Sequence, residues 1–491
     1  MESPAKYPQE VKILGSYFKR IPHFSLLRRL CRKSEVKVWL VGGFLRDAVL
    51  RKNKEFTDFD FCLEGDAEKF AQSFAALVGS KVITLDDGMG SFRVVVSHAG
   101  RNISFDFSRL RARDLPEDLR SRDFSINTLV LPLFERRPAV YDYCGAVKDI
   151  QRGVLRLMGK RVLADDPLRI LRGFYFFAAY GFSLSRPVLR LMAAHKRLLS
   201  RVSKERISEE LYKIFACQDS YKAVKPMADA GVLEVILPEL SSTKKVGQGA
   251  YHHLDVFDHS LETLRMFERL RERELKSQVC RQYLAARLAG FRTRAQLIKL
   301  ACLLHDIGKP AAKKRKGKKT IFHMHEKIGA AMAAQISRRL RLSGPEKNML
   351  GRLIFWHLRP GYLADQKKPT RRAVYRFFRD TGFDGVAVIM LSLSDWRATR
   401  GPLTDFKKRR THERVMLGLI KEYFAAQKRR PLPALLNGYV VMEKFNLTPS
   451  PLVGKILRRV REEQALGRVR TFEQALCLAK KIMDGKRHEQ T

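Results

Sequence analysis

The segment from Thr57 to Phe61, Thr-Asp-Phe-Asp-Phe, constrains the fold more than any other part of this sequence. Its alternation of polar and apolar residues predicts a β-strand. On such a strand Asp58 and Asp60 lie side by side on one face, while the two phenylalanines enter a core on the other. Paired carboxylates suit Mg²⁺, which prefers oxygen ligands and also takes phosphate oxygens. Two such ions activate an attacking hydroxyl and neutralise a leaving pyrophosphate, so the segment predicts a core strand with a catalytic Mg²⁺ site.

A glycine pair and two further charged residues accompany this strand. Gly42 and Gly43 have no side chains to block the approach of a phosphate to the backbone, and Arg46 adds a positive charge nearby. Asp106, on a second predicted strand, presents a third carboxylate. The alternative is a solvated Asp-x-Asp on an edge strand, an unrelated glycine turn and a surface acid. Each feature is weak alone, so the choice depends on the motifs downstream.

Strand and helix patterns divide the sequence into an α+β part and a helical part. Residues 66–78 have a helical period with Phe70, Phe74 and Leu77 on one face. From about Leu163 onward the strand signals stop. The strand patterns before that point cover residues 36–41, 81–85, 91–97 and 102–107. We therefore expect an α+β fold, in which a head with a small mixed β-sheet precedes a helical neck and body, a second helical domain and a helical tail.

A chain of 491 residues is too long for one hydrophobic core and predicts several domains. Residues 238–249 have the composition of a linker. The expected domains are an N-terminal helical extension, the head, the neck with the body, the second helical domain and the tail, at residues 1–35, 36–160, 161–245, 250–400 and 401–491.

The charge of the chain predicts a polyanionic partner. The formal net charge is +44, from 95 lysines and arginines against 51 acidic residues. Such an excess favours RNA, with binding that weakens steeply as salt rises. No apolar stretch is long enough to span a membrane, and the N-terminus has no signal layout. The seven cysteines are scattered without Cys-x-x-Cys spacing, which predicts buried thiols in a reducing cytoplasm and neither disulfides nor zinc.

Further motifs flank the strand in a defined order, at residues 41–47, 118–127, 142–149, 165–173 and 203–211. In order and spacing, the series resembles the tRNA nucleotidyltransferase and poly(A) polymerase family, the class II CCA-adding enzymes. Two positions depart from the family pattern: Ser121, where a second arginine is common, and Asp165, where CCA-adding members usually have glutamate. The resemblance implies template-independent addition of C and A nucleotides, CCA or part of it, to the 3′ end of tRNA, with CTP, ATP and Mg²⁺.

The resemblance also implies the residues of the site. The catalytic residues are Asp58, Asp60 and Asp106, and the first two hold Mg²⁺. Arg122 and Asp123 resemble the ribose-recognising pair of the family. The full nucleotide-binding set is Gly42, Gly43, Arg46, Arg122, Asp123, Asp166, Arg169, Arg172 and Arg206.

Asp166, Arg169 and Arg172 recur at a helical spacing that places them on one face. Asp166 accepts from the exocyclic amino group of cytosine or adenine, and Arg169 donates to the adjacent ring nitrogen. Uracil and guanine present the reverse pattern and leave buried groups unpaired, at a cost of about 1–3 kcal/mol each. The alternative is an intrahelical ion pair between Asp166 and Arg169. Pro167 is expected in the first turn of this helix, capped by Asp165 or Asp166.

A second constellation lies in the helical part: His259, the adjacent His305-Asp306, His325, His357 and Asp395. Imidazoles and carboxylates from several helices are the ligands of a divalent transition-metal site. The order resembles the HD-domain metal phosphohydrolases. The resemblance implies bound transition-metal ions and a phosphohydrolase activity, or a unit that only packs against the body. His252, His253 and His323 match nothing in the pattern and are expected to be structural.

Two other features point towards RNA. Basic runs recur at residues 313–319, 407–410 and 428–430, where solvated loops and direct RNA contacts are equal alternatives. Residues 435–454 resemble the closing region of the family, in which a helical tail binds the tRNA elbow; an ordinary helical cap is the alternative.

Three other functions compete with tRNA 3′-end addition. A poly(A) polymerase would share every motif. An HD phosphohydrolase with an inactive RNA-binding head and a non-catalytic basic RNA-binding protein both conflict with the presence of Asp58, Asp60, Asp166 and Arg169. The sequence predicts no membrane partner and no particular protein partner.

Overall fold

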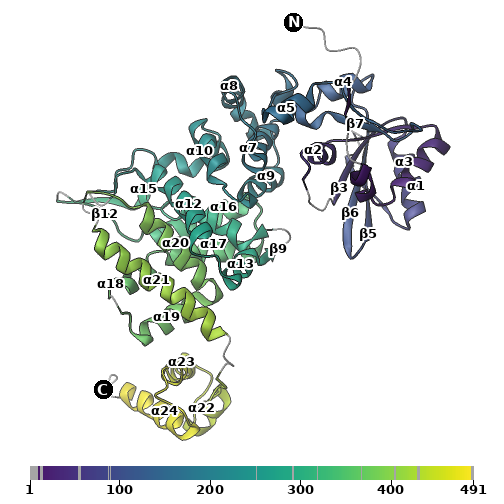
Figure 1. The fold of residues 1–491 in the computed structure, drawn as a ribbon. Coiled ribbons are helices and arrows are strands. Elements are labelled where there is room, and N and C mark those ends of the chain that lie inside the picture. The colour runs from purple at the N-terminus through teal and green to yellow at the C-terminus, as the bar shows by residue number, and fades with distance from the viewer. Residues whose placement is uncertain are drawn as a thin grey trace. The chain divides into compact units, whose positions relative to one another are not determined.

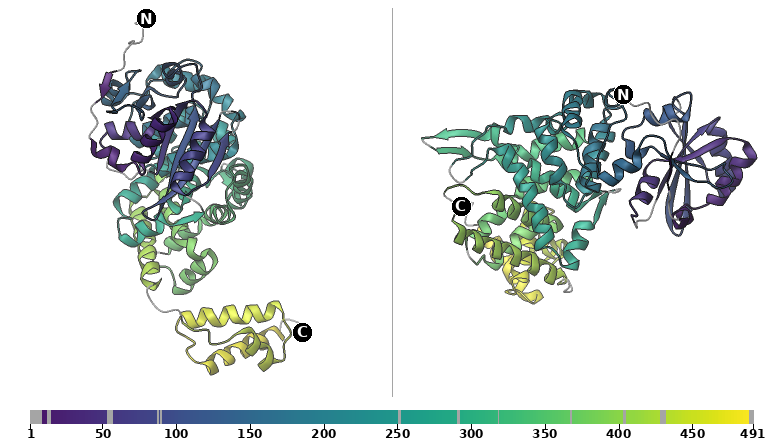
Figure 2. Two further views of the ribbon diagram at one scale, coloured as in Figure 1. Left: turned by 90° about the vertical axis from the view of Figure 1, so that its right-hand side faces the viewer. Right: turned by 45° about the horizontal axis from the view of Figure 1, so that its top comes forward.

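In the computed structural model, the segment around Asp58 is an interior strand of a mixed sheet of eight strands. The strands lie in the order β1-β8-β7-β2-β3-β6-β5-β4, and they run side by side in Figure 2. Every neighbouring pair is antiparallel except β3 and β6, which are parallel. The bounds are β1 (Gln9–Val11), β2 (Lys37–Val41), β3 (Asp58–Glu64), β4 (Val82–Asp86), β5 (Ser91–His98), β6 (Arg101–Arg109), β7 (Leu129–Pro132) and β8 (Val140–Asp142).

The chain divides into two compact units, residues 1–236 and 237–491. The structure describes residues 9–11, 15–52, 57–86, 88, 90–249, 252–289, 292–317, 319–366, 368–402, 405–427 and 432–487. The basic run at residues 428–430 therefore lies outside the described residues. Within the described ranges, no helix combines the length and the apolar character that crossing a membrane requires.

The helices of the first unit cover the sheet and then continue as a helical segment (Figure 1). Those of the head are η1 (Gly15–Arg20), α1 (Phe24–Ser34), α2 (Gly43–Val49), α3 (Ala67–Val78), α4 (Leu115–Arg120), η2 (Ser125–Asn127) and α5 (Ala146–Arg152). The helical segment comprises α6 (Val162–Asp165), α7 (Arg169–Tyr180), α8 (Arg186–His195), η3 (Lys196–Arg201), α9 (Lys204–Ala216), α10 (Tyr221–Asp229) and α11 (Leu233–Ile236).

Aromatic side chains form the core on one face of the sheet. Phe59 and Phe61 of β3 are fully buried and stack on Phe105 and Phe107 of β6. Phe74 of α3 covers these two phenylalanines of β6. Burying a phenylalanine contributes about 1.5–3 kcal/mol. The cluster therefore fixes the register of β3, which turns its two aspartates to the opposite face.

The strand and helix patterns of the head are confirmed, with two exceptions. Asp66 caps α3 by accepting a hydrogen bond from the backbone N–H of Lys69. Leu77, however, is 48% exposed, so the prediction that it shares the buried face of Phe70 and Phe74 is wrong. The N-terminal extension is also not wholly helical, because β1 pairs with β8 and extends the sheet.

The second unit is mainly helical. Its first elements are η4 (Pro238–Thr243), α12 (Val256–Arg273), α13 (Gln278–Ala285), β9 (Arg287–Ala289), β10 (Arg292–Thr293), α14 (Arg294–Leu304), α15 (Lys309–Ala312), β11 (Lys313–Lys316) and β12 (Lys319–Phe322). The next are α16 (His325–Arg339), α17 (Gly344–Trp356), α18 (Arg359–Asp365), α19 (Arg371–Thr381), η5 (Gly382–Asp384), α20 (Gly385–Ala398) and α21 (Phe406–Gln427). Helix α20 is buried along most of its length and packs on α12, α14 and α17. Because α20 is apolar on nearly all sides, it has to lie in the interior of the unit.

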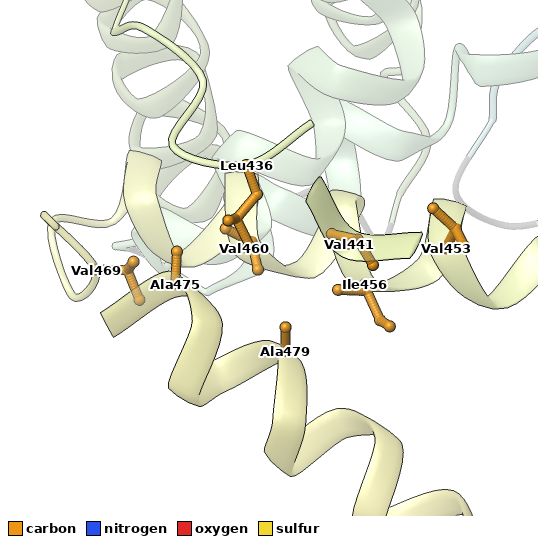
Figure 3. Close-up of a cluster of buried hydrophobic side chains, with 8 residues drawn as sticks. All are labelled: Leu436, Val441, Val453, Ile456, Val460, Val469, Ala475 and Ala479. Atoms are coloured by element: carbon orange, nitrogen blue, oxygen red, sulfur yellow. The ribbon is translucent and has the colours of Figure 1, made fainter. Parts of the chain in front are cut away.

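A small apolar core holds the tail together. The tail comprises α22 (Gly438–Phe445), α23 (Pro451–Ala465) and α24 (Phe472–Arg487). Figure 3 shows the buried side chains of this core, which are Leu436, Val441, Val453, Ile456, Val460, Val469, Ala475 and Ala479. The three helices thus pack through apolar residues at helical spacing. This packing is expected both for a tail that binds tRNA and for an ordinary helical cap, so it does not distinguish the two alternatives.

Two expectations for the helical part are wrong, and a third is met in part. Strands do not stop at Leu163, because β9 pairs with β10 and β11 pairs with β12. Residues 238–249, predicted to be a linker, directly follow the boundary between the two units, but they begin with η4, in which Leu240 and Thr243 are buried. The basic run at 407–410 belongs to α21 instead of a loop.

Candidate active site and metal centre

The aspartates of β3 and β6 come together where these parallel strands meet. Asp58 and Asp60 lie on the same face of β3, and the register pairs Asp60 with Asp106 of β6. Arg93 of β5 holds Asp106, with its Nε and Nη2 each donating to one carboxylate oxygen at 2.7 Å. Asp106, the predicted third carboxylate, therefore lies on the strand next to Asp58 and Asp60 and forms an ion pair with Arg93.

The surroundings of Asp60 favour a bound cation. This side chain opens into a cavity, but protein surrounds it, and the resulting desolvation is the main cause that raises its pKa. The charge of Asp106 raises the pKa further, whereas Arg122 and Arg172 lower it. A divalent cation would stabilise these crowded carboxylates, so the donor set fits Mg²⁺.

Gly42 lies directly against this carboxylate. Its φ of +79° belongs to the region that favours glycine, and a Cβ at this position would be 3.0 Å from Oδ2 of Asp60. A larger residue would strain the backbone and press on the aspartate. The predicted role of the glycine pair, close approach of backbone to ligand, therefore has a geometric basis at Gly42.

Asp60 and Asp106 open into a cavity of about 470 Å³, a volume typical of small-molecule sites. It lies within the first unit and collects side chains from the sheet, from the α4–η2 segment, from α7 and from α9. The predicted site residues in its lining are Gly42, Gly43, Arg46, Asp60, Asp106, Arg122, Asp123, Asp166, Arg169, Arg172 and Arg206. Asp58 is on the same face of β3 but is not part of the lining.

Arg46 supports the wall of the cavity. Its Nε donates to Asp47 at 3.0 Å, its Nη1 to Asn127 at 2.7 Å and its Nη2 to the hydroxyl of Tyr180 at 2.6 Å. The guanidinium also lies over the Tyr180 and Phe176 rings, at 4.4 and 5.1 Å from their centroids. These contacts join α2 to η2 and α7, while the phosphate contact predicted for Arg46 stays a prediction.

Arg122 and Asp123, predicted to recognise ribose together, have different partners. Arg122 donates through Nη2 to Asp118 at 3.1 Å. Asp123 accepts from the backbone N–H of Phe124 and the Asn127 amide on one oxygen, and from Nε of Arg172 at 2.8 Å on the other. Although burial opposes ionisation, Arg172 and these hydrogen bonds lower the pKa of Asp123. Asp123 therefore fixes Arg172 in the cavity wall.

The prediction that Asp166 lies on a helix with Arg169 and Arg172 is wrong. Helix α6 ends at Asp165, and Asp166 is extended, with φ −141° and ψ 97°. Pro167 disfavours the helical conformation in the residue before it, so Asp166 lies outside α7, which begins at Arg169. Pro167 also precedes α7, and the N-cap residue is Leu168, so the expected place of Pro167 in the first turn and the expected cap by Asp165 or Asp166 are wrong. The Asp166 carboxylate instead accepts from the backbone N–H of Leu168 at 3.2 Å.

The partner of Asp166 also differs from the alternative expectation of an intrahelical ion pair. Arg206 of α9 donates through Nη2 to Oδ2 of Asp166 at 3.0 Å. Arg169 donates through Nη1 to the carbonyl oxygens of Ser121 and Val162, at 3.0 and 3.2 Å, and is buried. Asp166 and Arg206 therefore line the cavity as an ion pair, while Arg169, which also lines the cavity, anchors α7 to the chain before it.

Several lining residues were not predicted as site residues. The polar and aromatic ones are Ser91, Ser108, Arg111, Asp118, Asn127, Tyr175, Phe176, Glu210 and Lys213. Glu210 and Lys213 lie one and nearly two helical turns after Arg206, and they form an ion pair at 2.7 Å. The 3.6-residue period of α9 was the signal that placed them on the face of Arg206.

The six predicted ligands of the second constellation meet inside the second unit. They come from α12, the end of α14, the start of α16, the end of α17 and α20. Their ligand atoms form two triads, each within 4.8 Å: His259, His305 and Asp395 in one, and Asp306, His325 and His357 in the other.

Hydrogen bonds in this cluster set the histidine tautomers. The Nδ1 atoms of His305, His325 and His357 lie 3.0, 2.8 and 2.6 Å from the backbone carbonyls of residues 302, 322 and 354. An Nδ1–H that donates to a carbonyl leaves the lone pair on Nε2, the form that binds metal. All three Nε2 atoms are buried, and the carboxylate of Asp306 faces them, at 3.2 Å from Nε2 of His305 and of His325 and at 3.7 Å from Nε2 of His357. Burial lowers the pKa of His357 to about 4, which keeps it neutral. Although burial opposes it, the carboxylates of Asp306 and Asp395 raise the pKa of His305 to about 10, so a metal ion that binds its Nε2 would displace a proton. The cluster therefore fits a transition metal.

Two neighbours of the cluster add to its chemistry. Lys309 of α15 lies 2.6 Å from Oδ2 of Asp306. The His252 ring packs edge-on against His259, with centroids 5.0 Å apart, and burial lowers the pKa of His252 to about 4. His252 was expected to be structural, and the structure places it beside a candidate ligand.

Known protein families match three parts of the chain. Residues 38–156 match the poly A polymerase head domain. Residues 181–244 match a family described as the probable RNA and SrmB-binding site of polymerase A. Residues 256–378 match the HD domain.

Similar whole proteins are known as well. The A-adding tRNA nucleotidyltransferase of Deinococcus radiodurans is 32% identical over 89% of this chain and 93% of its own. The CC-adding tRNA nucleotidyltransferase of Thermus thermophilus is 29% identical over 89% of this chain and 91% of its own. The fold is similar to that of the Thermotoga maritima CCA-adding enzyme complexed with tRNA, with a TM-score of 0.63, 19% identity and coverage of 97% of this chain and 99% of that one.

Proposed function

The chain belongs to the tRNA nucleotidyltransferase and poly(A) polymerase family, and from this premise we propose that it adds C and A nucleotides, CCA or part of it, to the 3′ end of tRNA. The 3′-hydroxyl oxygen of the RNA attacks the α-phosphorus of CTP or ATP. The bond from that phosphorus to the bridging oxygen breaks, pyrophosphate leaves and the hydroxyl proton is released. No nucleic-acid template takes part.

Asp58 and Asp60 are the proposed holders of Mg²⁺, with Asp106 beside them. When bound, Mg²⁺ supplies activation of the 3′-hydroxyl and neutralisation of the pyrophosphate. The protein itself contributes the placement of the reactants. Gly42 lets the nucleotide approach the backbone next to Asp60, and Arg122 and Arg172 bring positive charge to the same place.

Base choice is the proposed task of Asp166 and Arg206. The Asp166 carboxylate would accept from the amino group of cytosine or adenine, and Arg206 would donate to the adjacent ring nitrogen. The 3.0 Å contact between the two side chains holds acceptor and donor next to each other, as these base edges require. Uracil and guanine present a carbonyl and an N–H there, which leaves the protein groups unpaired.

The observation that carries the proposal is the shared cavity. It places Asp60 and Asp106 of the sheet in one space with Asp166 and Arg206 of the helical segment, so a nucleotide can meet catalytic carboxylates and base-recognising groups together. The test uses three tRNA transcripts, which end before CCA, after the first C and after the second C, each with labelled CTP or ATP alone. The extended transcripts separate full CCA, CC-only and A-only addition, and a long ladder with ATP on any RNA would favour a poly(A) polymerase.

We also propose a metal-dependent phosphohydrolase at the HD cluster, which the six converging ligands support. In such a reaction water adds to phosphorus and the alcohol leaves. Metal analysis of the purified protein and hydrolysis of bis(p-nitrophenyl) phosphate with added Ni²⁺ or Mn²⁺ test it. Absence of both metal and hydrolysis would leave the unit as a scaffold.

We propose functions for the remaining parts of the chain from the sequence motifs. We assign residues 36–160 to the catalytic head, 161–245 to nucleotide selection and RNA binding, 250–400 to the HD domain and 401–491 to a tail that contacts tRNA. The seven cysteines were predicted to be buried thiols, but Cys477 is exposed and Cys144 half-buried, so this prediction is wrong for two of them. We propose a cytoplasmic location from the tRNA substrate.

A further inference from the structure

The hairpin of β11 and β12 is a cationic feature to which the proposed function gives no role. Its register pairs Lys313 with Phe322 and Lys316 with Lys319, and the two strands form a sheet of their own. Figure 1 shows it extending away from the helices of its unit. An isolated two-stranded ribbon is marginally stable at best, so its charged sequence calls for a reason beyond stability.

Every residue from Lys313 to Lys319 is lysine or arginine except Gly317. The side chains of Lys313, Lys314 and Arg315 are exposed. Within the described part of the chain, no carboxylate forms an ion pair with any of these three. Because side chains alternate along a strand, Lys314 faces the opposite side of the ribbon from its two neighbours. Positive charge thus covers both faces, which suits a partner with many phosphates.

The base of the hairpin is fixed to the HD cluster at both ends. Before β11, Lys309 pairs with Asp306 at 2.6 Å. After β12, the carbonyl of Phe322 accepts from Nδ1 of the ligand His325 at 2.8 Å. Lys309 also lies 5.6 Å from the centroid of the Phe322 ring, which ties the two ends together. A phosphate chain held by the hairpin would therefore lead to the cluster.

Two aromatic residues directly precede the candidate ligand His357. Phe355 is 40% exposed and stands next to Trp356, which directly precedes the ligand His357. Arg359 lies 5.8 Å from the centroid of the Trp356 ring. The rings of His325 and His357 are 5.3 Å apart, so the segments that carry the hairpin and the aromatic residues meet there. Exposed rings beside basic side chains are the composition that binds single-stranded nucleic acid.

We propose that the β11–β12 hairpin is an RNA-binding arm of the HD cluster, which holds the phosphates of a single strand whose end lies at the cluster. The part about the cluster rests on the proposed phosphohydrolase; the part about RNA binding does not. Single-stranded RNA fits better than an anionic membrane, because charge on both faces leaves no apolar face to enter a bilayer.

The first experiment measures affinity for a short fluorescent single-stranded RNA across a range of NaCl concentrations. The variant replaces Lys313, Lys314 and Arg315 by glutamine in the full chain. Each phosphate contact contributes about 0.7 to the slope of log K against log salt, so the slope should fall in magnitude by about 2. The matched control replaces Arg269, Arg273 and Lys276 by glutamine. These exposed residues lie at and just beyond the C-terminal end of α12, and the control should keep the wild-type slope. An unchanged slope in the hairpin variant, or an equal change in both, would overturn the proposal.

The second experiment separates the arm from the chemistry. If the arm guides RNA to the cluster, the hairpin variant should lose about tenfold or more in kcat/KM on an RNA phosphoester and keep hydrolysis of bis(p-nitrophenyl) phosphate. Equal loss of hydrolysis on both substrates in the hairpin variant would contradict the proposal. Loss of nucleotide addition with hydrolysis of both substrates intact would contradict it as well. Loss of binding to phosphatidylserine vesicles with RNA binding intact would show that the hairpin binds a membrane surface instead. If the wild-type protein hydrolyses neither substrate, the proposed phosphohydrolase is refuted. The salt dependence of RNA affinity still tests whether the hairpin binds RNA.

Discussion

Replacing Asp166 by alanine should change base choice much more than stability. The structure supports this because the Asp166–Arg206 pair lies at the cavity, with the Arg206 side chain 52% exposed. An ion pair with that exposure contributes at most about 1 kcal/mol. In a unit the size of residues 1–236, this corresponds to a Tm shift of no more than about 4 °C. Loss of the acceptor, by contrast, removes about 1–3 kcal/mol of discrimination, roughly ten- to a hundredfold.

The assay measures incorporation of each of the four triphosphates into one tRNA, with Tm alongside. UTP and GTP should gain on CTP and ATP in the Asp166→Ala variant. Asp149→Ala is the control, because it breaks another Asp–Arg pair with an exposed arginine in the same unit, Asp149 with Arg156, away from the cavity lining. It should leave the four incorporation ratios unchanged. Unchanged ratios in Asp166→Ala with a lowered Tm would refute the assignment of base recognition.

Two other substitutions probe the two centres separately. Gly42→Ala should abolish nucleotide addition, because the new Cβ would press on Asp60. The control Gly79→Ala should keep nucleotide addition, because Gly79 has a similar positive φ but no atom within 4 Å of an added Cβ. Equal rates of nucleotide addition in both variants would contradict the role of Gly42. Asp306→Asn should remove transition metal, measured by elemental analysis, and spare nucleotide addition; retention of wild-type metal content would show that Asp306 is not a ligand.

Local patterns predicted the head well. The alternation of Asp58 to Phe61 implied one buried face, and the packing of Phe59 and Phe61 on Phe105 and Phe107 fulfils it. Periodicity failed where a backbone effect overrode it. Asp166 stands at helical spacing from Arg169, yet Pro167 keeps it extended.

Contacts between residues distant in sequence were harder to predict. The pairing of Asp166 with Arg206 joins two helical segments, and no spacing rule connects them. The β11–β12 hairpin was missed because lysine is depleted in strands, so Lys313 to Lys319 looked like a solvated loop. The histidine–aspartate cluster could be predicted because the order of its residues resembles a known family, although their helical period alone would not bring them together.

The most direct test of the central claim is nucleotide addition by Asp60→Asn, a nearly isosteric change that removes one carboxylate charge. Wild type and variant receive tRNA lacking its 3′ end, Mg²⁺ and labelled CTP and ATP, while tRNA affinity is measured in parallel. The account predicts that incorporation falls below detection and that tRNA affinity is unchanged, because the many lysines and arginines of the chain bind the phosphates. Incorporation by Asp60→Asn at close to the wild-type rate would contradict it.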